Sequence, residues 1–164
     1  MFSSKCSLNF LFLLILIFSS SDSISDTITF KGLILSNFWI KNVIANSKTT
    51  SGYIKIENKN EKNERLISVE SNFSKRTELH YMNIKNDIMI MKHLEDGVLI
   101  KSKSQINLKP RNFHIMFIDL SKSFNKTSNQ KVKFNFENAG SIIINMPIIN
   151  KAKISKDKKK HHHH

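Results

Sequence analysis

Hydrophobic and polar residues alternate along most of the chain in short runs, and no apolar stripe recurs at the helical period. Because residues two apart in a strand share a face, this alternation predicts half-buried β-strands. Turn-like segments such as Glu95–Gly97 and Asn138–Gly140 separate the runs. The predicted strands are Thr27–Leu35, Phe38–Ile44, Ser51–Glu57, Arg65–Glu70, Arg76–Met82, Asp87–His93, Ser104–Leu108, His114–Leu120, Lys131–Phe136 and Ser141–Pro147. Short strands that recur about every 8–12 residues predict an all-β antiparallel sandwich or small barrel with Greek-key connections.

The first 25 residues have the pattern of a signal peptide. Lys5 precedes an apolar run, Leu8–Phe18, and small residues follow it at Ser19–Ser23. That run is too short for a membrane-spanning helix, which needs about 20 residues. Cys6, the only cysteine, lies before the apolar run, so it is not placed as a lipoprotein cysteine and should leave with the leader. Residues 26–150 then form one domain, exported in our interpretation to the periplasm.

The carboxyl end, residues 151–164, is rich in lysine and ends in four histidines. Its six lysines and one aspartate supply +5 of the net charge of +13. We expect a disordered, solvated tail, and the alternative is a segment that captures metal or binds an anionic surface. Elsewhere the lysines are scattered, which together with export argues against nucleic acid as the partner.

Methionines and histidines are interleaved in the middle of the sequence. Thioether sulfur and neutral imidazole together suit a soft metal ion, and Cu(I) is the leading biological candidate. Alternation places His114 and Met116 on one strand face, opposite Ile115 and Phe117, and three neighbouring strands could direct such side chains to one point. The residues concerned are His80, Met82, Met89, Met91, His114 and Met116.

Other residues of the same types have plainer interpretations. Met146, beside Pro147, is expected to fill the core, as a lone methionine on a strand usually does. His93 precedes a turn and is expected to face solvent. Glu78 and Asp119 lie close to possible ligands in the sequence but are expected to be exposed charges.

The segment from Glu78 to Met116 resembles the copper chaperones of the PCu(A)C family. Their signature is a His, a Met about eleven positions on, and a His-X-Met a little over twenty residues later. Here His80 and Met91 are separated by ten residues, and twenty-two more precede His114-Ile115-Met116. Glu78–Met82 and Leu108-Lys109-Pro110 match further family patterns, as do Trp39 and Asn138-Ala139-Gly140. The similarity covers about Ile28 to Pro147.

The resemblance implies a cupredoxin-like Greek-key barrel that binds one Cu(I) through His80, Met91, His114 and Met116. It also implies a monomeric chaperone, not an enzyme, that delivers copper to the Cu(A) centre in cytochrome c oxidase subunit II, directly or through another chaperone. Arg111-Asn112 stands where the family usually has glycines, so the loop before His114 is expected to form a different turn. Met82 and Met89 are the reserve ligands.

Two other classes of function remain open: an exported metalloenzyme, such as a copper oxidase or a zinc hydrolase, and an exported interaction module. A zinc hydrolase would use His with carboxylate or Cys rather than Met, and no Ser-His-Asp or His-Glu-x-x-His pattern is evident. The sequence has no Cys-x-x-Cys-His motif for covalent haem attachment, and a small barrel leaves little room for a haem. The main alternative is an exported β-sandwich interaction module without a metal role, which Cu(I) titration would distinguish.

Overall fold

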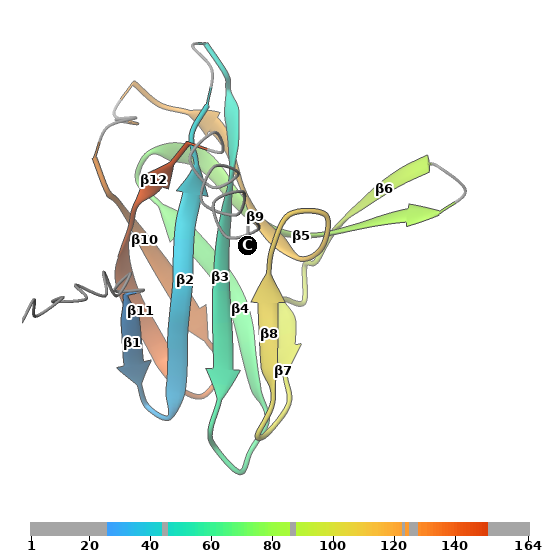
Figure 1. The fold of residues 1–164 in the computed structure, drawn as a ribbon, viewed down its shortest axis with the longest axis vertical. Coiled ribbons are helices and arrows are strands. Elements are labelled where there is room, and N and C mark those ends of the chain that lie inside the picture. Colours follow the sequence, from blue (N-terminus) through green and yellow to red (C-terminus); the bar gives the residue numbers. More distant parts are fainter. Residues whose placement is uncertain (1–25, 44–45, 86–87, 123, 125–127, 151–164) are drawn as a thin grey trace, which may run out of the picture.

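The computed structural model describes residues 26–43, 46–85, 88–122, 124 and 128–150. Every regular element in these ranges is a β-strand (Figure 1). The described part therefore contains no helix with the length and hydropathy of a membrane span. The expected signal peptide, residues 1–25, and the expected tail, residues 151–164, lie outside the described residues.

Two sheets pack face to face as a sandwich, which confirms the predicted all-β, cupredoxin-like class. The larger sheet has the order β1 (Thr27–Phe30), β2 (Leu33–Lys41), β3 (Thr49–Asn58), β9 (His114–Leu120), β5 (Ser74–Lys85) and β6 (Ile88–His93), with β12 (Ile148–Ile149) on β2 and β8 (Gln105–Leu108) on β3. The smaller has the order β11 (Gly140–Met146), β10 (Gln130–Phe136), β4 (Glu64–Ser71) and β7 (Val98–Ile100).

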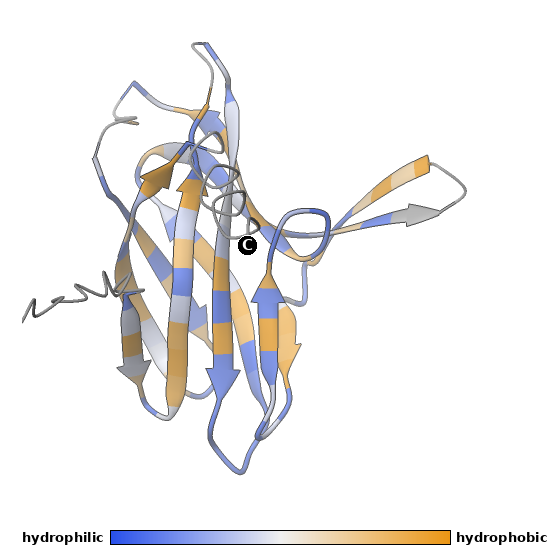
Figure 2. Cartoon of the chain, viewed as in Figure 1, coloured by the Kyte–Doolittle hydropathy of each residue, from blue (hydrophilic) through white to orange (hydrophobic). Residues whose placement is uncertain are grey.

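The core lies between the sheets and takes one residue in two from most strands. In β10, for example, Val132, Phe134 and Phe136 are buried while Lys131 is exposed. Each such aliphatic or aromatic side chain contributes about 1.5–3 kcal/mol on burial. Met146 is completely buried in this core, which confirms its expected role as filler. The alternation visible in Figure 2 is thus the main determinant of the fold.

The observed strands differ from the predicted ones in several places. The expected strand Thr27–Leu35 is a hairpin, because Lys31 and Gly32 turn the chain between β1 and β2 with φ of 47° and 79°. A Lys-Gly pair is not among the strong hairpin signals, so the alternation of apolar and polar residues predicts one continuous strand there. The three-residue strand β7 was also missed, since it is too short to show a period.

Glu64 is a buried carboxylate at the start of β4 that holds the turn between β10 and β11. Its Oε1 accepts hydrogen bonds from the backbone N–H groups of Arg65 at 2.8 Å and Asn138 at 2.9 Å, and Oε2 accepts one from Ala139 at 2.9 Å. The residue is only 3% exposed. The predicted Asn138-Ala139-Gly140 turn is therefore fixed by a charge from a strand far away in the sequence.

The β5–β6 hairpin projects from the body of the sandwich (Figure 1). Every residue of β6 is exposed, although four of the six are Ile or Met. Figure 2 shows that the outer part of β6 is hydrophobic. This hairpin brings exposed methionines beside the outer face of the larger sheet.

Candidate metal centre

The predicted ligands lie on three adjacent strands of the larger sheet, as the sequence indicated. In the β5–β9 pair His80 is opposite His114, and in the β5–β6 pair Met82 is opposite Met91. Directly opposed residues on antiparallel strands project from the same face. Since Leu79 and Ile115 are in the core, the His and Met side chains share the outer face of the sheet.

A pocket of about 340 Å³ lies on this face. It contains three of the four predicted ligands, Met91, His114 and Met116, together with the reserve candidates Met82 and Met89. The remaining lining residues are Trp39, Lys41, Ser51, Tyr53, Pro110 and Arg111. The Trp39 and Tyr53 rings are in contact, with centroids 4.4 Å apart. The pocket therefore combines soft thioether donors with an aromatic wall. Trp39, which matched the family pattern in the sequence, is part of this wall.

His114 is buried, and one of its ring nitrogens already has a partner. Its Nδ1 lies 2.8 Å from the backbone carbonyl of Asn112. A carbonyl only accepts hydrogen bonds, so Nδ1 carries the proton and a neutral ring keeps its lone pair on Nε2. The same carbonyl also accepts a hydrogen bond from the N–H of Met82 at 3.3 Å. His114 is thus oriented by a backbone group in the way typical of metal-binding histidines.

His80 does not line the pocket directly, but its ring lies next to that of His114, with centroids 5.8 Å apart. Its Nε2 donates to the Glu78 carboxylate at 2.8 Å, and its Nδ1 is buried without a hydrogen-bond partner. Buried polar atoms in proteins almost always have a partner. A ring whose Nε2 is protonated has its lone pair on Nδ1, so this orphaned atom fits a metal ligand.

The expectation that Glu78 is an exposed charge is wrong, because its side chain is only 18% exposed. The hydrogen bond from His80 is the main cause that lowers the pKa of Glu78 below its usual value. Sequence reasoning assigned no role to Glu78, although residues two apart on a strand share a face and that rule could have paired it with His80. Asp119, in contrast, is exposed as expected.

The two predicted thioethers differ in exposure. Met116 is half-buried, and its sulfur lies 3.5 Å from the Ser51 hydroxyl on β3. Met91 is 46% exposed on the projecting hairpin. The centre therefore has a fixed side, built from His114 and Met116 on β9, and an open side built from the hairpin.

The loop before His114 has a glycine-type conformation although it contains no glycine. Arg111 has a φ of 64°, in the left-handed region that favours glycine. The loop is closed by hydrogen bonds between Lys109 and Phe113 at 2.8 Å and between Asn112 and Lys109 at 3.2 Å. Arg111 thus adopts a backbone conformation that glycine would adopt at lower cost.

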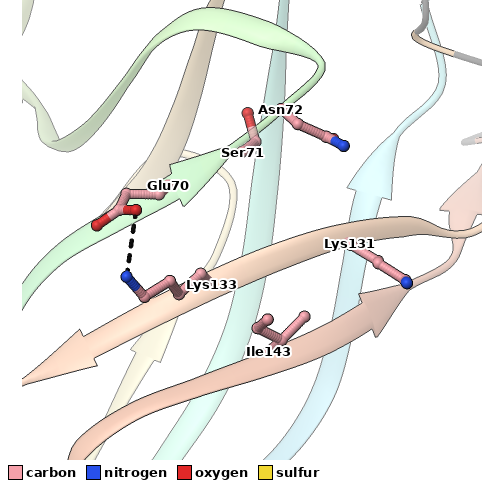
Figure 3. Close-up of a pocket in the computed structure, with 6 residues that line it drawn as sticks. All are labelled: Glu70, Ser71, Asn72, Lys131, Lys133 and Ile143. Carbon is pink, nitrogen blue, oxygen red and sulfur yellow. Dashed lines mark hydrogen bonds and ion pairs between the residues drawn. The ribbon is translucent and has the colours of Figure 1, made fainter.

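Other possible sites in the described residues are less suited to a metal. No group of three or more His, Cys, Asp or Glu side chains is arranged to hold an ion in that part of the chain. A pocket of about 320 Å³ over β4, β10 and β11 (Figure 3) is lined by Glu70, Ser71, Asn72, Lys131, Lys133 and Ile143. Among these described lining residues the one carboxylate, Glu70, is paired with Lys133 at 3.4 Å, and none is His or Met. The His and Met residues point instead to the outer face of the larger sheet.

The burial of His114 predicts a pH dependence of stability. Burial is the main cause that lowers the pKa of His114 below its usual 6.5. Between that native pKa and 6.5 the unfolded chain binds more protons, so the free energy of unfolding should fall as the pH drops below about 6.5. Urea unfolding of the metal-free protein between about pH 7 and 5 would measure this.

Carboxylates do not obscure this measurement. The pKa values of Glu57, Glu70 and Glu78 are lowered from 4.5, so most of their contribution to stability is lost below about pH 4.5. His114→Gln should abolish the slope above about pH 5. A wild-type free energy that stays constant from about pH 6.5 to 5 would show that His114 titrates normally.

Comparison with known proteins supports one family. The model of the family described as "Putative lipoprotein LpqE-like" matches residues 33–148. None of the curated proteins is a significant match. Among solved structures, the copper-bound PCuAC domain from PmoF2 is 17% identical, with a TM-score of 0.65, covering 76% of this chain and 98% of that domain.

Two further structures have the same fold. The apo PCuAC domain from PmoF1 is 21% identical, with a TM-score of 0.64, covering 76% of this chain and 99% of that one. The solution structure of Cu(I)-DR1885 from Deinococcus radiodurans is 11% identical, with a TM-score of 0.57, covering 80% and 85% respectively. The family match and this shared fold together confirm the resemblance to PCu(A)C proteins inferred from the sequence.

Proposed function

Because the chain belongs to the LpqE-like family, we propose that it is an exported copper chaperone that carries one Cu(I) ion. The proposed ligands are His80, Met91, His114 and Met116. Copper is the cargo here, received at the open side of the centre and passed on by ligand exchange. The similar structures include a copper-bound PCuAC domain and Cu(I)-DR1885, which supports copper as the ion.

The observation that carries this proposal is the register of β9, β5 and β6. It places His80 opposite His114 and Met82 opposite Met91, with Met116 two residues along β9 from His114. Sulfur and imidazole donors from distant parts of the sequence thus share one face and border one pocket. Thioethers do not protonate and are soft ligands, so this donor set favours Cu(I) over harder ions.

The exposed hairpin gives the proposal a route for transfer. Met91 is accessible, and β6 also exposes Ile88 and Ile90 at 66% and 47%. An acceptor that docks on this apolar hairpin could exchange its own ligands for Met91 while His114 still holds the ion. The proposed acceptor is the Cu(A) site of cytochrome c oxidase subunit II or an intermediary chaperone, and the proposed compartment is the periplasm. The family that matches this chain is described as putative lipoproteins, which agrees with export.

A Cu(I) competition titration combined with X-ray absorption tests the proposal. The protein should be the full chain with each of His161, His162, His163 and His164 replaced by Ala, so that the terminal imidazoles do not compete. We expect one Cu(I) per chain, with both sulfur and nitrogen neighbours. Absence of Cu(I) binding would refute the proposal and favour the alternative, an exported interaction module whose contact surface is the apolar β6 hairpin.

A further inference from the structure

His80 has a second imidazole neighbour that is not among the proposed Cu(I) ligands. His93, at the end of β6, lies directly opposite His80 in the β5–β6 ladder. Their ring centroids are 5.4 Å apart, closer than the 5.8 Å between His80 and His114. Because opposed residues share a face, all three imidazoles project from the outer face of the larger sheet. His93 is exposed, as the sequence predicted.

The donors are sorted along the hairpin by chemical type. At its base are the three imidazoles and the Glu78 carboxylate, which accepts the hydrogen bond from His80. Further out, the ladder places Met82 opposite Met91. Imidazole and carboxylate are harder donors than thioether and suit Cu(II), which binds nitrogen and oxygen sites more tightly than the other divalent first-row ions. The base and the outer part of the hairpin therefore favour different oxidation states of copper.

We propose that His80, His93 and His114 form a Cu(II) site that shares two ligands with the Cu(I) site. The inference rests on the proposed function and extends it to the second common oxidation state of the cargo. Since His80 and His114 belong to both ligand sets, the two ions compete and one copper is bound at a time. His93 is the residue that distinguishes the two sites.

The donor atoms needed for this site are available. The bond to Asn112 leaves the lone pair of His114 on Nε2, and the bond to Glu78 leaves that of His80 on the buried, unpartnered Nδ1. The three imidazoles do not yet enclose one point. Closure requires His93 to change rotamer, which an exposed side chain does within nanoseconds. Glu78 keeps its place on His80 and fixes the orientation of that ring.

Cu(II) titration of variants at His93 tests the inference. The parent is the full chain with its four terminal histidines replaced by Ala, and the probe is Cu(II) alone, followed by competition titration and electron paramagnetic resonance. Loss of a direct ligand should weaken metal binding at least as much as loss of an outer hydrogen-bond partner, which weakens it about 10–100-fold. We therefore expect His93→Ala to weaken Cu(II) binding at least about tenfold and to reduce nitrogen hyperfine coupling.

Cu(I) titration of the same proteins separates this inference from the proposed function. His93→Ala should leave Cu(I) affinity unchanged, and Lys92→Ala, the exposed neighbour on the opposite face of β6, should change neither affinity. An unchanged Cu(II) affinity and spectrum in His93→Ala, or an equal loss for both ions, would overturn the inference. A parent that binds Cu(I) but not Cu(II) would refute this site alone, whereas a parent that binds neither would refute both.

Discussion

Removal of the Met116 sulfur is expected to weaken Cu(I) binding by about 100-fold or more, since a direct ligand should contribute at least as much as its outer hydrogen-bond partners. Met116→Leu is the sharpest variant, because it keeps the volume of the side chain and removes only the thioether. His114→Ala should cause a loss of similar size, since it removes the imidazole that β9 holds at the edge of the pocket. Competition against a Cu(I) chelator measures both effects.

Two controls make this comparison specific. Met146→Leu alters a methionine that is completely buried in the core, so Cu(I) affinity should not change. His93→Ala alters an exposed imidazole outside the proposed Cu(I) ligands and should also have little effect. Equal losses at positions 93, 114, 116 and 146 would contradict the proposed site.

Substitution of Met by Leu also identifies the second thioether ligand. Met91 is the ligand indicated by the family resemblance, but Met82 lies directly opposite it and Met89 also lines the pocket. Met91→Leu should weaken Cu(I) binding far more than Met82→Leu or Met89→Leu. A larger loss at Met82 or Met89 would move the ligand to that position and leave the proposed function intact.

Strand alternation predicted which side chains of the candidate site share a strand face. His114 and Met116 are two residues apart, so any strand there directs both away from the core residues Ile115 and Phe117. Alternation within one strand, however, does not determine which strands become neighbours. The order β9-β5-β6, which brings His80 between His114 and His93, comes from long-range pairing.

Features that depend on contacts between distant residues were not predictable in this way. The chain turns at Lys31 with a positive φ, and Asn60 supports that turn with a hydrogen bond to the Lys31 carbonyl at 3.0 Å. Arg111 adopts a glycine-like conformation inside a loop closed by backbone hydrogen bonds. In both cases the surrounding structure compensates for a local conformational cost of about 1–2 kcal/mol.

Glu64 is the strongest example of such a long-range contact, and its loss should be severe. A carboxylate at the start of a strand is expected to be exposed, yet Glu64 is buried and accepts three backbone hydrogen bonds. Glu64→Ala leaves the N–H groups of Arg65, Asn138 and Ala139 without this acceptor. An unsatisfied buried donor costs about 1–3 kcal/mol. Because the Ala139 hydrogen bond is buried and the other two are partly buried, we expect the free energy of unfolding to fall by about 2–4 kcal/mol, measured by urea titration.

Two further variants show whether this loss comes from the buried acceptor. Glu64→Gln keeps one oxygen but places an amide donor against one of the N–H groups, so it should lose about half as much stability as Glu64→Ala. Glu137→Ala, in the same turn, removes a 56% exposed carboxylate 3.9 Å from Arg65 and should change stability by less than about 0.5 kcal/mol. If Glu64→Ala were as mild as Glu137→Ala, water would have to satisfy the freed donors. The β10–β11 turn would then be held by the β-ladder alone.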